Sequence, residues 1–386
     1  MSRDFSPVVD LLEALVGFAT VSDRPNTDLI KFVADYLDRH KVRYHIFPDA
    51  TGEKQGLIAH IGPEVAGGVI LSGHTDVVPV EGQVWSSDPF TLSQRVGRYV
   101  GRGTCDMKGF LALALAAVPH MVAAPLKRPV QLAFSFDEEV GCIGTGAVLD
   151  ALEQHFPRAD AVIVGEPTEM GVVSGHKGGI GMVTRINGKA AHSSRPDLGV
   201  SAISYAAQVI AWHVAQMDKA RLSSVDLGFV PPYSTAQVGT ISGGVALNTV
   251  AELCTLETDI RHLPTENARD WIAPYQAELA QIEQAMKSEH SEASIVLEIT
   301  ETVPAMISEA NGVAEALARR LTGDNTQRFV SYQTEAGHFQ AAGYSTVVCG
   351  PGSIEQAHKP DEFITVAQLR HGQAFMAALI ETLIQG

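Results

Sequence analysis

Short apolar runs that lead directly into histidine or acidic residues recur along this chain of 386 residues. Such runs are typical of buried strands in an α/β fold, in which ligands gather beyond the carboxyl ends of the strands. We therefore expect the polar residues that follow these runs to lie close together. They are His74 and Asp76 after 69–72, Asp137, Glu138 and Glu139 after 131–136, Glu166 after 161–164, and His358 after 345–349.

The pattern of apolar residues also predicts how the chain is divided. Up to residue 177, short strands alternate with helices, which indicates an α/β layer architecture. The next segment has the order βαββαβ, which is the split-βαβ order of a ferredoxin-like unit. We predict an α/β fold with a discontinuous catalytic domain, 1–177 and 303–386, and an inserted ferredoxin-like α+β domain, 178–302. The elements expected in the insertion are strand 180–187, helix 199–217, strands 235–242 and 251–261, helix 266–287 and strand 294–301.

Composition excludes several classes of partner. The formal net charge of −16 argues against nucleic acid and against anionic membrane surfaces. The four cysteines are scattered, as in a reduced cytosolic protein, and the N-terminus, with Asp4 and Asp10, lacks the apolar segment of a signal peptide. We therefore expect a cytoplasmic protein. The uncharged stretch 109–126 is interrupted by Pro119, and we expect a buried core helix at 110–118 instead of a membrane span.

The clustered residue types are those of a metal-hydrolase site. Imidazoles and carboxylates suit Zn²⁺, Mn²⁺ or Co²⁺, and an excess of carboxylates fits two metals better than one tetrahedral zinc. Asp106 adds a carboxylate from a glycine-rich loop before the expected helix. Glu138 and Glu139 cannot share one role, because successive side chains diverge in extended backbone, so one would bind metal and the other would act as general base. The residues alone leave open a capping role for His74 or Asp106 and a solvated pair for the two glutamates.

Five sequence strings resemble those of the di-zinc amidohydrolase and exopeptidase family. The resemblance extends from about residue 10 to the C-terminus, and the strings occur in the family's order. It implies a metallo-exopeptidase-like catalytic domain, an inserted dimerisation domain and the hydrolysis of an amide bond. The strings are GHTDVVP (73–79), W-x-x-DPF (85–90), GRGTCDMKG (101–109), FDEEVGCIGT (136–145) and VGEPT (164–168).

For the metal centre, the resemblance implies two divalent ions, with Zn²⁺ expected first and Co²⁺ or Mn²⁺ as alternatives. Each candidate ligand matches a family position in the strings or near the C-terminus. Asp106 would bridge the two ions, His74 and Glu166 would complete one site, and Glu139 and His358 would complete the other. Asp76 would orient the His74 ring, and Glu138 would act as general base.

The resemblance also implies residues that contact the substrate. His192, in the insertion, would reach the active site of the neighbouring subunit and help to hold the oxyanion, so the active form would be a homodimer. Arg261 ends an alternating strand on its polar face, and its planar fork would bind the substrate carboxylate. Asn248 resembles an asparagine near the same pocket. The loop containing Gly352 offers backbone N–H groups to a carboxylate, with a plain turn as the alternative.

Four further strings resemble the family members that deacetylate acetylornithine. One of them contains Glu335, where a carboxylate would favour a substrate with a second, cationic amine. The segment 262–264, His-Leu-Pro, departs from the pattern of those members. We expect a small N-acyl amino acid as substrate, with N2-acetyl-L-ornithine first and another acylated amino acid or a dipeptide as the alternative. A non-catalytic ligand-binding relative is a further alternative. The strings lie at 175–181, 191–200, 334–336 and 350–362.

Overall fold

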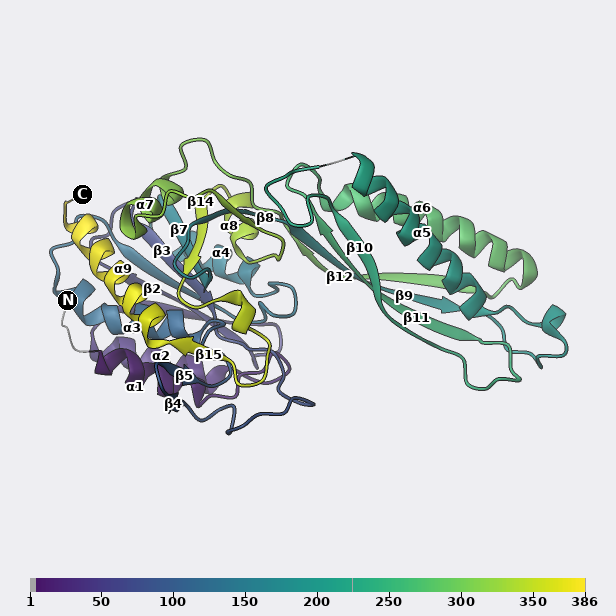
Figure 1. The fold of residues 1–386 in the computed structure, drawn as a ribbon, viewed down its shortest axis with the longest axis horizontal. Helices are drawn as coiled ribbons and strands as arrows, with labels where there is room; N and C mark the ends of the chain where they lie inside the picture. Colours follow the sequence, from purple (N-terminus) through teal and green to yellow (C-terminus); the bar gives the residue numbers. More distant parts are fainter. Residues whose placement is uncertain (1–4, 224, 386) are drawn as a thin grey trace. The chain divides into compact units, whose positions relative to one another are not determined.

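Two compact units make up the computed structural model, which describes residues 5–223 and 225–385 (Figure 1). The first unit contains the chain up to Gly175, Ser308–Arg328 and the chain from Thr334 onward. The second contains His176–Ile307 and Phe329–Gln333. The predicted insertion, 178–302, omits this last short segment. Asp4, which entered the interpretation of the N-terminus, lies outside the described residues.

An eight-stranded mixed sheet forms the centre of the first unit. In spatial order its strands are β1 (Arg43–Pro48), β2 (Gln55–Ile61), β6 (Val130–Ser135), β3 (Val69–His74), β7 (Ala161–Pro167), β14 (Ser345–Gly350), β8 (Val173–His176) and β13 (Arg328–Val330). The neighbours β6, β3, β7 and β14 are parallel, whereas β1 pairs antiparallel with β2, β2 with β6, and β8 with β14. The four parallel strands therefore end at the same edge of the sheet, as the sequence predicts for the polar residues that follow them.

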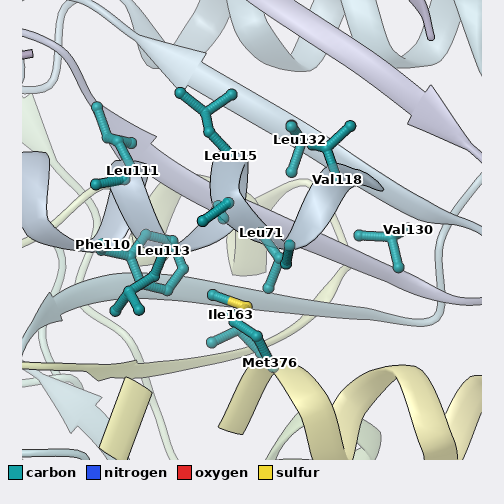
Figure 2. Close-up of a cluster of buried hydrophobic side chains, with 14 of the residues drawn as sticks. Leu71, Phe110, Leu111, Leu113, Leu115, Val118, Val130, Leu132, Ile163 and Met376 are labelled. Carbon is teal, nitrogen blue, oxygen red and sulfur yellow. The ribbon is translucent and has the colours of Figure 1, made fainter. Parts of the chain in front are cut away.

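Helices cover both faces of this sheet. On one face, Leu71 and Ile163 pack with side chains of two helices in a buried hydrophobic cluster (Figure 2). Ile70 and Val162, which alternate with them, are fully buried outside that cluster, so the opposite face is covered as well. The helices of this unit are α1 (Ser6–Val16), α2 (Thr27–Arg39), α3 (Lys108–Ala123), α4 (Thr145–His155), α7 (Val313–Thr322), α8 (Ala336–Ala341) and α9 (Val366–Gln385).

Helix α3 is the buried core helix that the sequence predicts. All residues from 109 to 118 are buried, and the helix contacts α1 and α9. It continues beyond the predicted end at residue 118, because Pro119 removes one backbone donor without ending the helix. Among the helices of the described ranges, none has the length and apolarity needed to cross a membrane.

A small sheet, which the sequence analysis does not predict, joins two distant loops. Its strands are β4 (Ser93–Arg95), β5 (Arg98–Val100) and β15 (Phe363–Thr365), and β5 pairs with both of the others. Just beyond this pairing, the backbone N–H of Gly101 donates to the carbonyl of Glu362 over 2.9 Å. The glycine-rich loop that carries Asp106 is thereby placed beside the segment that follows a short 3-10 helix, η2 (Ile354–Gln356).

The second unit has the predicted ferredoxin-like topology. Its sheet is antiparallel, in the order β10 (Thr235–Gly243), β11 (Leu253–His262), β9 (Gly178–Asn187) and β12 (Ser294–Val303). Helices α5 (Ala202–Ser223) and α6 (Ala268–Glu289) pack on it, and a 3-10 helix, η1 (Pro196–Leu198), precedes α5. In β11, Cys254, Leu256 and Ile260 are fully buried in the core of this unit, which confirms the predicted alternation.

The core of the second unit contains a histidine without a polar partner. His213 in α5 is 2% exposed, and neither of its ring nitrogens has a hydrogen-bond partner within the described ranges. Its ring contacts those of Trp212 and Tyr275, with centroids 5.0 and 4.7 Å away. Burial lowers the pKa of His213 from the ordinary value of 6.5 to about 4. The imidazole is therefore neutral in the folded protein at neutral pH.

We predict that His213 makes the second unit sensitive to acid. Because its folded-state pKa lies below the unfolded value, the unfolded chain binds the proton more tightly, and the free energy of unfolding falls as the pH drops from about 6.5 to about 4. The shift corresponds to at most about 3 kcal/mol. His213→Phe should remove this part of the pH dependence, measured by urea unfolding followed through Trp212 and Trp271 fluorescence.

The matched control for this prediction is His371→Phe, at an exposed position of α9 in the first unit. This variant should retain the pH dependence of the wild-type protein. An equal loss of stability between pH 7 and pH 4.5 in His213→Phe and in wild type would show that the buried ring does not cause it.

Candidate metal centre

The five predicted ligands meet at the carboxyl edge of the parallel strands. His74 is the last residue of β3, and Glu166 lies near the end of β7. Glu139 follows β6, His358 follows β14 and η2, and Asp106 precedes α3. The register supports this convergence, since β3 pairs in parallel with both β6 and β7. All five residues belong to the first unit.

Asp106 lies between the two histidines. Its Oδ1 is 3.0 Å from Nε2 of His74, and its Oδ2 is 3.4 Å from Nε2 of His358. Each imidazole also faces a glutamate: His74 Nε2 lies 3.6 Å from Oε1 of Glu166, and His358 Nε2 lies 3.0 Å from Oε2 of Glu139. The result is two sets of ligand atoms that share one carboxylate, with one carboxylate oxygen directed toward each set.

The hydrogen bond of His74 leaves its second nitrogen available as a ligand. Nδ1 lies 2.9 Å from the backbone oxygen of Asp76 and donates its N–H to it. The lone pair of Nε2 then faces Asp106 and Glu166, as a metal-binding imidazole requires. The carboxylate of Asp76 is farther from the ring, at 3.6 Å from Nδ1. The structure thus refines the expected role of Asp76, because its main-chain carbonyl is the closest partner of the ring.

The carboxylate of Asp76 holds the adjacent turn. It accepts hydrogen bonds from the backbone N–H groups of Glu138 and Glu139, over 3.1 and 3.2 Å, and from the hydroxyl of Ser22 over 2.7 Å. Asp76 is 2% exposed, so these bonds form away from competing water. One buried side chain therefore fixes the backbone of the predicted base and of a predicted ligand.

The electrostatics of the cluster show an excess of negative charge. Burial raises the pKa of Glu138 to about 8 and that of Glu139 to about 7, and it raises the pKa of Glu166 well above its ordinary range. Hydrogen bonds to Asp106 and Glu139 raise the pKa of His358 to about 10. In the absence of cations these groups compete for protons, because like charges cannot all ionise in a shared buried site.

Two divalent cations fit this donor set. Oε1 of Glu139 and Oε1 of Glu166 are buried and have no hydrogen-bond partner among residues 5–223 and 225–385, although buried carboxylate oxygens are almost always paired. Two groups of residues each offer ligand atoms within 4.8 Å of one another, and mixed nitrogen and oxygen donors suit Zn²⁺, Mn²⁺ or Co²⁺. The groups are His74, Asp106 and Glu139, and His74, Glu138 and Glu166.

Three predicted substrate residues belong to the second unit and are described within that unit alone. His192 is exposed, and its Nδ1 accepts the backbone N–H of Ser194 over 3.2 Å. Asn248 is also exposed, and its backbone carbonyl accepts the N–H of Ser193 over 2.9 Å, so the loop of Asn248 lies beside the loop of His192. Arg261 is partly buried and forms an ion pair with Asp259 over 2.9 Å.

Two other residues that are predicted to contact the substrate have hydrogen-bond partners within the protein. Glu335 is fully buried, and its two oxygens accept hydrogen bonds from the hydroxyls of Ser72 and Ser135 over 2.7 and 2.8 Å. It therefore presents no free carboxylate to a substrate ammonium. The N–H of Gly352, which the sequence suggests as a donor to a substrate carboxylate, donates to Oε1 of Gln368 over 3.2 Å.

A buried ion pair beside Asp106 was not predicted from the sequence. Arg102 and Glu362 are each 1% exposed, and their side chains lie 2.8 Å apart. Both residues occur in strings that resemble the family, but charged residues in loops are usually solvated. The only sequence signal was their place in those strings, next to Asp106 and close to His358.

Comparison with known proteins identifies the family. Residues 70–382 match the model of peptidase family M20/M25/M40. An acetylornithine deacetylase of Pasteurella multocida is 32% identical over 98% of both chains, and one of Proteus mirabilis is 34% identical over 97% of this chain and 96% of the relative.

Solved structures have the same fold. An M20 family metallo-carboxypeptidase of Sulfolobus solfataricus aligns with a TM-score of 0.78 over 100% of both chains, at 16% identity. A dinuclear metal-binding peptidase of the M20 family from Bacillus subtilis aligns with a TM-score of 0.62 over 98% of both chains, at 14% identity. The chain belongs to peptidase family M20/M25/M40 and is a metal-dependent amidohydrolase.

We predict that Zn²⁺ stabilises the protein through Asp106. An ion that binds only the folded state at 100 times its Kd adds about 2.7 kcal/mol to the free energy of unfolding. Asp106→Asn removes the negative charge shared by both ligand sets, so it should abolish most of this gain. The measurement is the melting temperature with Zn²⁺ and with a chelator.

Glu315→Gln is the control for this prediction, because Glu315 pairs with Arg319 on α7, outside the ligand cluster. It should respond to Zn²⁺ as the wild type does. If Asp106→Asn gained as much stability from Zn²⁺ as the wild type, Asp106 would not be a shared ligand.

Proposed function

We propose that this chain hydrolyses the N-acetyl amide of N2-acetyl-L-ornithine to L-ornithine and acetate, a step of arginine biosynthesis. The observation that carries the proposal is the 32% and 34% identity, over nearly the whole chain, to relatives named acetylornithine deacetylase. The four cysteines are free and buried, which supports the cytoplasmic setting of such a reaction.

Two divalent ions, Zn²⁺ in the first place and Co²⁺ or Mn²⁺ as alternatives, are proposed to bind in the ligand cluster. His74 and Glu166 would hold one ion, Glu139 and His358 the other, and Asp106 would contact both. When bound, such ions polarise the amide carbonyl and lower the pKa of water. The orphaned oxygens of Glu139 and Glu166 support this assignment.

Glu138 is the proposed general base. It offers a carboxylate oxygen in the same small group as His74 and Glu166, and its backbone is fixed by Asp76. The neighbouring thiol of Cys142 donates to its Oε1 over 3.4 Å. In this role Glu138 takes a proton from the attacking water and returns it to the amine nitrogen as the carbon–nitrogen bond breaks.

His192 is the proposed donor to the oxyanion. Nδ1 lies 2.8 Å from the hydroxyl and 3.2 Å from the backbone nitrogen of Ser194; in the tautomer in which it accepts from both, the neutral ring carries its proton on Nε2, which is then a donor. A donor aimed at the developing oxyanion stabilises the tetrahedral state. His192 is exposed at the surface of the second unit, and we propose that it acts on the site of the partner subunit in a homodimer.

Exposed apolar side chains on the second unit support a dimer. Val245 and Leu247, in the turn after the edge strand β10, are 89% and 102% exposed. Ile241 on β10 and Ile299 on the other edge strand, β12, are 51% and 42% exposed. Exposed apolar residues on an edge strand are typical of association surfaces, since an uncovered edge is prone to pairing.

Arg261 and Asn248 are the proposed binding residues for the α-carboxylate of the substrate. The Arg261 guanidinium already pairs with a carboxylate, that of Asp259, and its planar fork suits bidentate contacts. Asn248 adds an exposed amide beside the His192 loop. Both residues would recognise the part that all N-acyl amino acids share.

A second candidate is an aminoacylase or dipeptidase with the same metal core. The burial of Glu335 favours it, because this carboxylate was the one residue expected to select a cationic side chain. The departure from the deacetylase pattern at 262–264 is consistent with it. The two candidates differ in the substrate side chain and share the chemistry.

A panel of acetylated amino acids separates the candidates. N2-acetyl-L-ornithine and N-acetyl-L-norvaline have the same chain length and differ by the terminal amine. Hydrogen bonds to charged groups contribute about 1.5–3 kcal/mol, so acetylornithine should have a kcat/KM about 10- to 100-fold higher with Zn²⁺ or Co²⁺. Equal values would favour the aminoacylase, and no turnover with full metal occupancy would favour a non-catalytic binder.

We predict that Glu138→Gln lowers kcat by about 10²- to 10⁴-fold while both metals remain bound. Metal content is measured alongside turnover, and Glu64→Gln, at an exposed position, is the control. Near wild-type turnover with both metals bound would rule out Glu138 as the base.

Mixing two inactive variants tests the role of His192. In a mixed dimer of Glu138→Gln and His192→Ala subunits, one site keeps its base and receives an intact His192 from the partner. Random exchange of equal amounts should restore about a quarter of the wild-type activity. If mixing restored none, His192 would not act across subunits.

A further inference from the structure

The buried pair Arg102 and Glu362 is more than an isolated ion pair. Both side chains are 1% exposed and lie 2.8 Å apart. A buried ion pair is a weak source of stability, because the cost of removing two charges from water offsets their attraction. The hydrogen bonds that the two side chains make to neighbouring loops indicate the role of the pair.

Glu362 holds the loop that carries the shared ligand. Its Oε1 accepts the backbone N–H groups of Cys105 and Asp106, over 2.8 and 3.1 Å. Its Oε2 accepts the N–H of Gly103 over 3.1 Å in addition to the Arg102 guanidinium. Three amides of one short loop thus converge on one carboxylate, which fixes the backbone at Asp106.

Arg102 connects this loop to the loop of His358 through Gln83. One guanidinium nitrogen of Arg102 donates to Oε1 of Gln83 over 2.6 Å. The amide nitrogen of Gln83 in turn donates to the backbone carbonyl of His358 over 2.9 Å. Oε1 of Gln83 also accepts from the indole of Trp85 over 3.1 Å, which fixes the orientation of the amide.

The two ligand sets are supported in different ways. His74 and Glu166 lie within the strands β3 and β7 and are buried, so the sheet itself positions them. His358 lies in a loop, its side chain is 54% exposed, and its backbone φ is +62°, in the left-handed region. A ligand on such a loop needs support from neighbouring side chains, and the carbonyl bond from Gln83 supplies it.

We propose that Arg102, Glu362 and Gln83 are positioning residues of the metal centre, and that Gln83 sets the metal affinity of the site completed by His358. The inference rests on the ligand assignment of the proposed function. Glu362 fixes the backbone at Asp106, Gln83 fixes the backbone at His358, and Arg102 connects Glu362 to Gln83. Loss of the Gln83 donor therefore weakens the ion held by His358 and leaves the ion held by His74 in place.

The test is a calorimetric titration of the metal-free protein with Zn²⁺ alone, which measures the affinity of each bound equivalent. Gln83→Leu removes the whole link, whereas Gln83→Glu keeps an acceptor for Arg102 and removes only the donor to His358. Loss of a group that orients a ligand typically lowers metal affinity by about 10- to 100-fold. Both variants should lose that much for one equivalent only. Gln83→Glu, which keeps the acceptor for the buried guanidinium, should leave the melting temperature of the metal-free protein unchanged.

Glu362→Gln should weaken both equivalents, because Asp106 contacts both ions. Gln131→Leu is the matched control. Gln131 is a buried glutamine of strand β6 that donates to the backbone carbonyl of Pro157 over 2.7 Å, and its loss should change the affinity of neither zinc equivalent. If wild type bound fewer than two equivalents, the proposed metal centre would fail. If wild type bound two, and Gln83→Leu and Gln83→Glu bound both as tightly, the positioning role alone would be overturned.

Discussion

Repulsion among buried carboxylates is the constraint on which the catalytic unit depends. Asp106, Glu138, Glu139 and Glu166 share a small volume, and burial raises the pKa of each of the three glutamates. Such an arrangement is unfavourable unless protons or cations offset it. The surrounding sheet and helices stabilise a backbone that holds these groups together, and divalent ions are the proposed counter-charge that would leave the proposed base free to act.

Two buried acids position the loops around the cluster in the same way, by accepting hydrogen bonds from backbone N–H groups. Asp76 accepts the amides of Glu138 and Glu139, and Glu362 accepts the amides of the Asp106 loop. In both cases a carboxylate outside the ligand set fixes backbone N–H groups, so the ligand side chains project from a rigid loop. The site is therefore built from strands on one side and from clamped loops on the other.

Strand ends were predictable from the sequence, and contacts between distant loops were not. His74 and Glu166 followed from apolar runs, since parallel strands deliver their carboxyl ends to one edge. The burial of Glu335 was not predictable, because a sequence does not reveal that the hydroxyls of Ser72 and Ser135, from two other strands, hydrogen-bond its carboxylate. The support from Glu362 was missed for the same reason, because it depends on a small sheet of three-residue strands that carry almost no periodic signal.

The central claim is that one carboxylate joins two metal sites, and crystals loaded with Zn²⁺ test it most directly. Anomalous diffraction at the zinc edge should show two peaks about 3.5–4 Å apart, the spacing of two-metal hydrolytic sites. Both peaks should contact Asp106, one together with His74 and Glu166 and the other together with Glu139 and His358. A single peak, or a second peak away from Asp106, would contradict it.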